Sequence, residues 1–330
     1  MRRRRLRQYL PGFSELRRAL TDTVAERAVR DAYDPQLAKA VAGIEPVALA
    51  RHIEVLTAPG PRSAEDPGNV EAALRYLRAE LTASGYDVLQ EQFGDAPHQV
   101  SLFATLPGTD PSAPLLELGA HWDTVQGSPG ADDNASGVAG VLEIARAARR
   151  FGPLPRGIRF CLFGGEEEWM AGSSAHVKGF LAGGEAVEGL IVLEMIGFRD
   201  TRPGSQRAPL RIPGVFAPPR TGNFIAVIAD LRSLPFANAV QRGARLYVPT
   251  LDIYLLKRIG GLLRDAARSD HLPYWRTAHR GLLVTDTANL RNPHYHKATD
   301  TLDTIDPDFA ADVSRAVAAA LADLAGRPRD

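Results

Sequence analysis

Three short segments of this chain are apolar on both faces, and they restrict its fold more than any other feature. They span residues 158–163, 190–195 and 224–228. A strand with one face in water alternates polar and apolar residues, whereas an unbroken apolar run suits a strand buried between two helical layers. Because buried parallel sheets are built from such strands, the sequence predicts an α/β protein.

The remaining periodicity extends this prediction to a complete architecture. Further strands are predicted at residues 88–93, 100–106, 115–118 and 282–284, and helices at residues 13–57, 70–84, 136–150 and 309–324, with Pro35 and Pro46 interrupting the first helical region. Residues 58–63 and 66–68 read as loops, and the Pro-, Gly- and Arg-rich residues 199–222 as a long loop. We therefore expect a three-layer α/β/α sandwich around a central, mostly parallel mixed sheet.

Composition excludes several classes of protein. The 330 residues contain 45% hydrophobic and 24% charged residues, which is typical of a globular protein. Basic and acidic residues balance at a formal net charge of zero, which argues against a nucleic-acid binder. No apolar stretch reaches the roughly 18 residues of a membrane span, and Cys161 is the only cysteine.

The first residues are strongly basic, with five arginines between Arg2 and Arg7. The apolar region that would complete a signal peptide does not follow them, so we expect a solvated tail and a cytoplasmic protein. Residues 1–45 are predicted to form a basic arm with a helical extension. Residues 46–330 are predicted to form a single catalytic domain, and the sequence leaves its oligomeric state open.

Polar residues gather where the predicted strands end. In chain order these are His121-Trp122-Asp123, Asp132-Asp133-Asn134, Glu166-Glu167-Glu168, Glu194, and His294-Tyr295-His296. Each group alone has an ordinary explanation, such as a helix N-cap or a solvated acidic run. Glu194 is harder to explain, because a carboxylate in a buried strand is costly unless it is paired or binds a metal. Ligands of open α/β sheets bind beyond the carboxyl ends of the strands, where all these groups would meet.

The residue types at this edge indicate hydrolytic metal chemistry. Imidazole and carboxylate ligands without thiolates are typical of catalytic rather than structural zinc sites. The number of carboxylates indicates two metals, since a bridging carboxylate can hold two cations about 3.5–4 Å apart. Two such cations would activate a water molecule, and a further carboxylate would transfer its proton to the leaving amine.

These motifs together resemble metallopeptidase family twenty-eight, which includes di-zinc aminopeptidases, glutamate carboxypeptidases and glutaminyl cyclases. The resemblance runs from about residue 47 to residue 306 and also involves Ser269-Asp270-His271 and Asp300-Thr301. It implies the zinc-peptidase fold and two Zn²⁺ ions per chain.

Carried over to this sequence, the resemblance makes five residues zinc ligands. His121 and Glu194 would hold one zinc, Glu167 and His296 the other, and Asp133 would bridge them. Its place three residues before Ser136 selects Asp133 over Asp132, and the peptide bond after it is often cis in the family. His296 is preferred to His294 because it follows Tyr295.

Three further residues receive roles from the same resemblance. Glu166 would be the general base, because its spacing to Gly172-Ser173 selects the first two of the three glutamates. Asp123 would orient the imidazole of His121, and Tyr295 would stabilise the developing oxyanion. In one departure, Glu194 stands where the best-known aminopeptidases have aspartate, although glutamate also occurs in bacterial relatives.

The resemblance implies an exopeptidase acting on peptides, with removal of N-terminal residues as the first expectation. Surplus acids such as Glu168 or Asp132 could receive the substrate amine. A glutamate-type carboxypeptidase is the alternative, because Arg199, Arg202, Arg207, Arg211 and Arg220 could grip a terminal carboxylate. A glutaminyl cyclase-like acyltransferase is less favoured, since cyclases tend to have tryptophan at the position of Tyr295. A non-catalytic binding module is least favoured, because every ligand position is filled.

Overall fold

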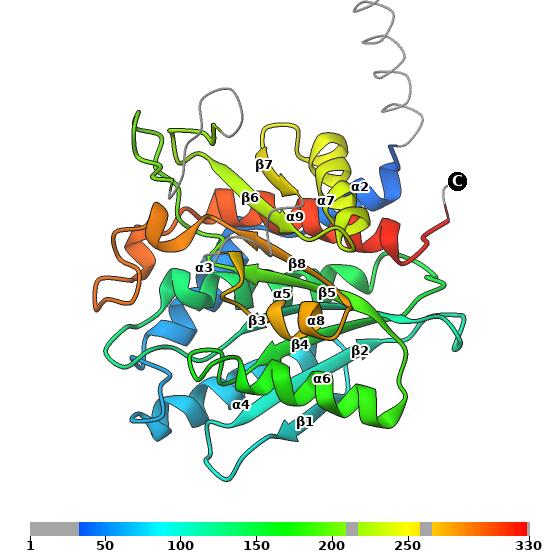
Figure 1. The fold of residues 1–330 in the computed structure, drawn as a ribbon, viewed down its shortest axis with the longest axis horizontal. Coiled ribbons are helices and arrows are strands. Elements are labelled where there is room, and N and C mark those ends of the chain that lie inside the picture. Colours follow the sequence, from blue (N-terminus) through cyan, green and yellow to red (C-terminus); the bar gives the residue numbers. More distant parts are fainter. Residues whose placement is uncertain (1–32, 209–216, 258–265, 329–330) are drawn as a thin grey trace, which may run out of the picture.

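The computed structural model describes residues 33–208, 217–257 and 266–328, which form three layers (Figure 1). Within these residues the middle layer is an eight-stranded sheet of order β1-β2-β4-β3-β5-β8-β6-β7. Its strands are β1 (Val88–Gln92), β2 (Val100–Leu106), β3 (Leu115–His121), β4 (Ile158–Phe163), β5 (Val187–Glu194), β6 (Phe224–Ala229), β7 (Asp252–Lys257) and β8 (Arg280–Thr285).

The sheet is mixed, with a parallel centre. Strands β4, β3, β5 and β8 run parallel to one another, and β6 and β7 run parallel to each other. The β1–β2, β2–β4 and β6–β8 pairs are antiparallel. The carboxyl ends of the four central strands therefore meet at one edge, as a ligand site in this architecture requires. The predicted fold class is confirmed.

Helices cover both faces of the sheet. A large apolar core packs one face against α2 (Pro35–Ala42), α3 (Pro46–Thr57), α4 (Pro67–Ala83), α5 (Gly137–Ala148), α7 (Leu234–Tyr247) and α9 (Pro307–Leu324). A smaller core on the opposite face, which includes Phe163 and Val192, packs against α6 (Ala171–Gly183) and α8 (Leu272–Arg276). In Figure 1, α6 and α8 lie in front of the sheet and α5 lies behind it.

Several helices begin with proline, which lacks the N–H that a first turn leaves unpaired. The Asp306 side chain caps α9 by accepting a hydrogen bond from the Phe309 N–H. The same preference corrects one prediction: Asp66-Pro67-Gly68 is not a loop, because Pro67 is the first residue of α4. Gly85, with φ +83°, follows the end of that helix as predicted.

Strand β3 is longer than the predicted residues 115–118 and ends at His121. Gly119 allows this, because a Cβ at that position would lie 2.8 Å from the Phe163 ring. His121 is therefore the last residue of a strand that is buried from its second residue on, rather than part of a following loop, which fixes its direction relative to the sheet.

Among the α-helices and β-strands of the described chain, the sequence patterns missed α6, α7, α8 and β7. The predicted loops at residues 58–63 and, where described, 199–222 are confirmed, and the Asp200–Gly222 bridge closes the base of the longer one. The predicted arm at residues 1–45 lies outside the described residues except for α2 and its flanks. None of the described helices is long and apolar enough to cross a membrane.

Candidate metal centre

The carboxyl ends of β3 and β5 bring the first group of candidate ligands together. His121 and Glu194 end these neighbouring strands, and the Nε2 atom of His121 lies 3.2 Å from Oε1 of Glu194. The irregular turn before α5 adds Asp133, whose Oδ1 lies 3.3 Å from the same nitrogen. One ligand atom from each of the three residues lies within 4.8 Å of the others.

Asp133 also belongs to a second group, with Glu167 and His296. Its other oxygen, Oδ2, lies 3.1 Å from Nε2 of His296, which is 3.4 Å from Oε1 of Glu167. The ligand atoms of this group also lie within 4.8 Å of one another. The structure thus brings all five predicted ligands into one place, with Asp133 shared, and the Asp133–Asn134 peptide bond is cis, as expected.

The side chains of both groups fit divalent cations. Oε1 of Glu167 is buried and accepts no hydrogen bond from the described residues, although His296 Nε2 lies 3.4 Å away, so it lacks the partner that a buried oxygen requires. Burial would raise the pKa of Asp133, but His121 and His296 hold it well below its usual range. Burial would lower the pKa of His296, but Asp133 and Glu167 raise it to about 10. The cluster therefore stabilises positive charge at both positions.

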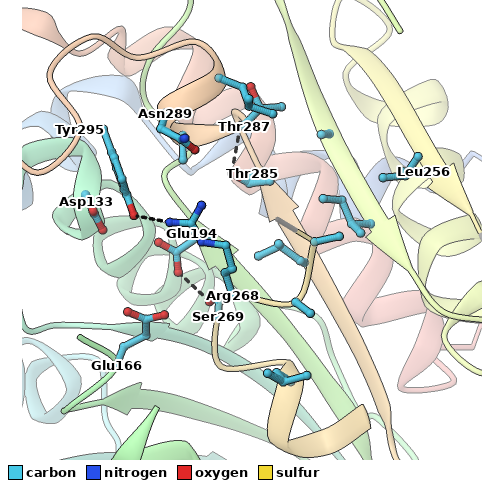
Figure 2. Close-up of a pocket in the computed structure, with 18 of the residues that line it drawn as sticks. Asp133, Glu166, Glu194, Leu256, Arg268, Ser269, Thr285, Thr287, Asn289 and Tyr295 are labelled. Atoms are coloured by element: carbon cyan, nitrogen blue, oxygen red, sulfur yellow. Dashed lines mark hydrogen bonds between the residues drawn. The ribbon is translucent and has the colours of Figure 1, made fainter. Parts of the chain in front are cut away.

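Glu166 lies beside the two groups but belongs to neither. It follows Gly164 and Gly165 at the end of β4, and its carboxylate points into the cavity near Asp133 and Glu194 (Figure 2). The pKa of Glu166 lies well above its usual range. Burial raises it most, the carboxylates of Glu194, Asp270 and Glu167 raise it further, and His121 opposes them. A carboxylate with a raised pKa suits a group that must accept and hold a proton.

Asp123 is arranged differently from the prediction. Nδ1 of His121 lies 3.1 Å from the Asp123 main-chain carbonyl and 3.6 Å from its carboxylate. The carboxylate instead accepts hydrogen bonds from the backbone N–H groups of Glu166 and Glu167, at 3.2 and 3.1 Å. Asp123 therefore orients the imidazole through its backbone and the two glutamates through its side chain.

A second buried carboxylate holds the opposite loop in the same way. Asp300 accepts hydrogen bonds from the N–H groups of Asp132 and Asp133, at 2.9 and 3.1 Å. Each of the two acidic loops is thus fixed by a carboxylate that receives two consecutive peptide N–H groups. The sequence contained Asp300 in a family motif, but its spacing gave no sign of this contact.

Arg62 is a supporting residue that the sequence did not indicate. Its guanidinium is fully buried and donates to four main-chain carbonyls, those of Leu56, Trp122, Pro129 and Gly130. Burial lowers the pKa of Arg62 to about 10. Because its partners are backbone atoms on both sides of the β3 end, Arg62 joins the loop after His121 to the loop before Asp133.

Tyr295 lies at the cavity wall close to both groups. Its ring stacks on the His296 imidazole with centroids 3.8 Å apart, and its hydroxyl accepts a hydrogen bond from Arg268 Nη2 at 3.3 Å. Figure 2 shows this hydroxyl and the Glu194 carboxylate on either side of the Arg268 guanidinium. Ser269 donates to the other oxygen of Glu194 at 2.7 Å and so holds it in place.

The candidate ligands open into a cavity of about 430 Å³. Asp133, Glu166 and Glu194 lie at one end, whereas Leu256 lies at the other (Figure 2). Side chains of β6, β7 and β8 give this second end an apolar wall made of Phe224, Ala226, Ile228, Tyr254, Leu256 and Leu283. The cavity therefore combines a charged end with an apolar end.

The surplus acids of the motifs have other partners. Glu168 accepts a hydrogen bond from Gln99 and lies 2.7 Å from Nε2 of His98. Asp132 is fully buried and accepts hydrogen bonds from the Asn292 side chain and the Gly197 N–H. Neither residue lines the cavity, so the structure does not support a role for them in receiving a substrate amine.

The arginine-rich loop also contributes less than expected. Arg199 pairs with Asp306 and Arg202 with Asp200, both away from the cavity. Of the four described arginines only Arg207 lines the cavity, and Arg211 lies outside the described residues. His271, in the Ser269-Asp270-His271 motif, is buried 2.8 Å from the Ala266 carbonyl and has no place in either ligand group.

Comparison with known proteins agrees with this geometry. The sequence profile of peptidase family M28 matches residues 101–215. YfbL of Escherichia coli K12, an uncharacterized protein, is 32% identical over 272 residues, which cover 77% of this chain and 80% of YfbL. Leucine aminopeptidase 1 of Arthroderma otae is 27% identical, covering 76% of this chain and 65% of that protein.

A solved structure extends the likeness to the fold. The LapA aminopeptidase of Legionella pneumophila superposes with a TM-score of 0.72 at 20% sequence identity, covering 89% of this chain and 75% of that one. At this identity the likeness supports the shared architecture, and the chemistry must be argued from the residues themselves.

Proposed function

This chain belongs to peptidase family M28, a family of hydrolases acting on peptide bonds, and on that premise we propose that it is a zinc aminopeptidase with two cations per chain. The observation that carries the proposal is the sharing of Asp133 between two ligand groups, with Glu166 beside them and bound to neither. His121 and Glu194 would complete one site, and Glu167 and His296 the other.

The charged end of the cavity favours an amino terminus over a carboxyl terminus. Four carboxylates line it, those of Asp133, Glu166, Glu167 and Glu194; the two cations would neutralise the three that are ligands, so Glu166 is the carboxylate left to face an ammonium group. Arg207 and Arg268 also line the cavity, but they donate to the Asn289 carbonyl and the Tyr295 hydroxyl. The apolar wall opposite supports a large apolar N-terminal residue as the preferred one, in keeping with the names of the leucine aminopeptidase relatives.

The chain's own groups account for proton transfer. Zinc bound at the two positions would supply Lewis acidity to the attacking water and to the scissile carbonyl. Glu166 takes a proton from the water and delivers it to the leaving amine, for which its raised pKa suits it. The Tyr295 hydroxyl, held by Arg268, donates a hydrogen bond to the carbonyl oxygen as negative charge develops there.

Three substrates and a metal analysis test the proposal. Zinc-loaded protein should hydrolyse leucine anilide, lose the activity to a chelator and regain it with zinc, and elemental analysis should approach two zinc ions per chain. Cleavage of an N-acylated peptide with C-terminal glutamate would instead favour the carboxypeptidase alternative. Cyclisation of an N-terminal glutaminyl peptide with one zinc per chain would favour the acyltransferase. The cytoplasmic location and the division at residue 45 stay predictions, which cell fractionation and a chain starting at residue 46 would test.

A further inference from the structure

The most exposed large apolar side chain in the described part of the protein lies at the rim of the catalytic cavity. Trp169 is 88% exposed, lines the cavity and follows Glu166 by three residues. Its indole makes no hydrogen bond or ring contact with the described residues. An indole left in water this way contributes almost no burial energy to the fold, so its position calls for another explanation.

The backbone at Trp169 is one that tryptophan rarely adopts. Trp169 and Met170 have φ values of +65° and +60°, and the Met170 N–H donates to the Glu166 carbonyl at 2.9 Å to close the turn. Met170 is 8% exposed, so the turn buries the methionine and directs the indole outward. Glycine adopts this conformation without the steric cost of a bulky residue. Fold stability alone would therefore favour glycine at position 169.

The turn is also anchored on its outer side. Glu168, immediately before Trp169, lies 2.7 Å from His98 Nε2 and accepts a hydrogen bond from Gln99. On its inner side the Asp123 carboxylate holds the N–H groups of Glu166 and Glu167. The indole is thus presented from a loop fixed at both ends, and a preorganised surface binds a ligand with less loss of conformational entropy.

We propose that Trp169 forms a subsite for the side chain on the leaving-group side of the scissile bond. The inference rests on the proposed aminopeptidase function, in which the N-terminal side chain occupies the apolar end of the cavity near Leu256. Glu166 protonates the leaving amine, so the rest of the peptide leaves past the loop that carries both Glu166 and Trp169. An indole face there takes an aromatic or branched aliphatic residue.

Leucine dipeptide amides that differ only in the second residue test the subsite. The ratio of kcat/KM for Leu-Phe-amide to that for Leu-Gly-amide should be about tenfold in the wild type, as expected for one aromatic contact. In Trp169→Gly the ratio should fall to near one, and Trp169→Phe should restore most of it. Because glycine suits the +65° backbone, Trp169→Gly should unfold at a Tm equal to or above that of the wild type.

Leu89→Ala is the matched control, because Leu89 is 66% exposed on β1 and does not line the cavity; its ratio should equal the wild-type ratio. An unchanged ratio in Trp169→Gly, with both substrates turned over, would overturn the subsite and leave the aminopeptidase function standing. The subsite would be overturned in the same way if that variant changed only the oligomeric state. Absence of turnover of either amide by zinc-loaded wild-type protein would instead overturn the proposed function, and the subsite with it.

Discussion

In the described part of this protein, two clusters contain histidine and carboxylate side chains close enough to share a cation, yet the two differ in how their charges are balanced. The candidate metal centre lies at the carboxyl ends of β3 and β5. The second cluster, which we call the inner network, lies on the face of the sheet covered by α6 and α8. It consists of Glu117, Arg159, Cys161, His176 and Tyr274, and the ligand atoms of its Glu117, Cys161 and His176 lie within 4.8 Å of one another.

The inner network satisfies its own charges. Oε1 of Glu117 lies 2.8 Å from His176 Nε2 and 3.2 Å from Arg159 Nη1, while the Tyr274 hydroxyl donates to Oε2. Burial would lower the pKa of His176, but hydrogen bonds to Glu117 and Glu91 raise it to about 9. The buried carboxylate is therefore neutralised by protein cations, and a metal would have to displace Arg159.

The candidate metal centre is not balanced in this way. It gathers the carboxylates of Asp133, Glu167, Glu194 and Glu166 around two imidazoles, and the described residues donate no hydrogen bond to the buried Oε1 of Glu167. The comparison teaches that residue types and proximity do not distinguish a metal site from a structural network. Surplus negative charge and a buried oxygen that lacks a hydrogen bond distinguish the metal site from the structural network.

The largest expected effect concerns the carboxylate that stays outside both ligand groups. Glu166→Gln removes the proton acceptor and keeps the shape, so kcat on leucine anilide should fall about 10³-fold while bound zinc stays at the wild-type amount. Glu168→Gln is the matched control, since Glu168 is bonded to His98 and Gln99, and it should retain most activity. Near-normal kcat in Glu166→Gln would refute the assigned role.

Metal binding itself should separate the two clusters. Removing a residue that only supports a metal ligand weakens metal binding by at most about 100-fold. His296→Ala removes a ligand of the second group itself, so it should weaken binding of one cation by more than that. Glu117→Gln, checked for native circular dichroism, should bind the same number of zinc ions as the wild type. Loss of zinc from a folded Glu117→Gln protein would show that the inner network also binds metal.

The inner network should instead make the free energy of unfolding depend on pH. The folded pKa of His176, about 9, lies above the unfolded value, so its stabilisation is fully present below about pH 6.5 and is lost as pH rises towards 9. The contribution lost is roughly 3 kcal/mol at most. The free energy of unfolding, measured with urea at about pH 6.5 and about pH 9, should decrease more between these values in the wild type than in His176→Gln. Equal decreases in the two proteins would mean that His176 is not held protonated.

The sequence predicted what apolar pattern and side-chain motifs encode. Strands such as residues 158–163 were found because burial on both faces leaves an unbroken apolar run. Glu194 was found because it ends such a strand, and His121 because it follows a predicted strand. Helix α6 was missed because its Gly- and Ser-rich sequence has no marked apolar stripe. Arg62 was missed because its partners are main-chain carbonyls, which leave no signature in the sequence.

The smallest expected effect concerns the support of the candidate metal centre rather than its ligands. Asp300 accepts the N–H groups of Asp132 and Asp133 and is buried, whereas the inner network has no carboxylate that fixes a loop in this way. In Asp300→Asn an amide NH₂ would face one of these N–H groups, so one hydrogen bond would be replaced by a repulsive contact. The loop carrying Asp133 should then shift, although no ligand is removed.

We therefore expect Asp300→Asn to bind zinc about tenfold more weakly and its kcat/KM to fall by a similar factor. Effects of this size are usual when a residue that supports a metal ligand is substituted. Excess zinc should restore much of the activity, which a general loss of folding would not permit. Asp303→Asn is the matched control, because Asp303 is exposed and, among the described residues, its side chain accepts a hydrogen bond only from Thr301 in the same segment. If both variants bound zinc as the wild type does, the loop would keep Asp133 in place without Asp300. The candidate metal centre would then differ from the inner network in its ligand groups alone.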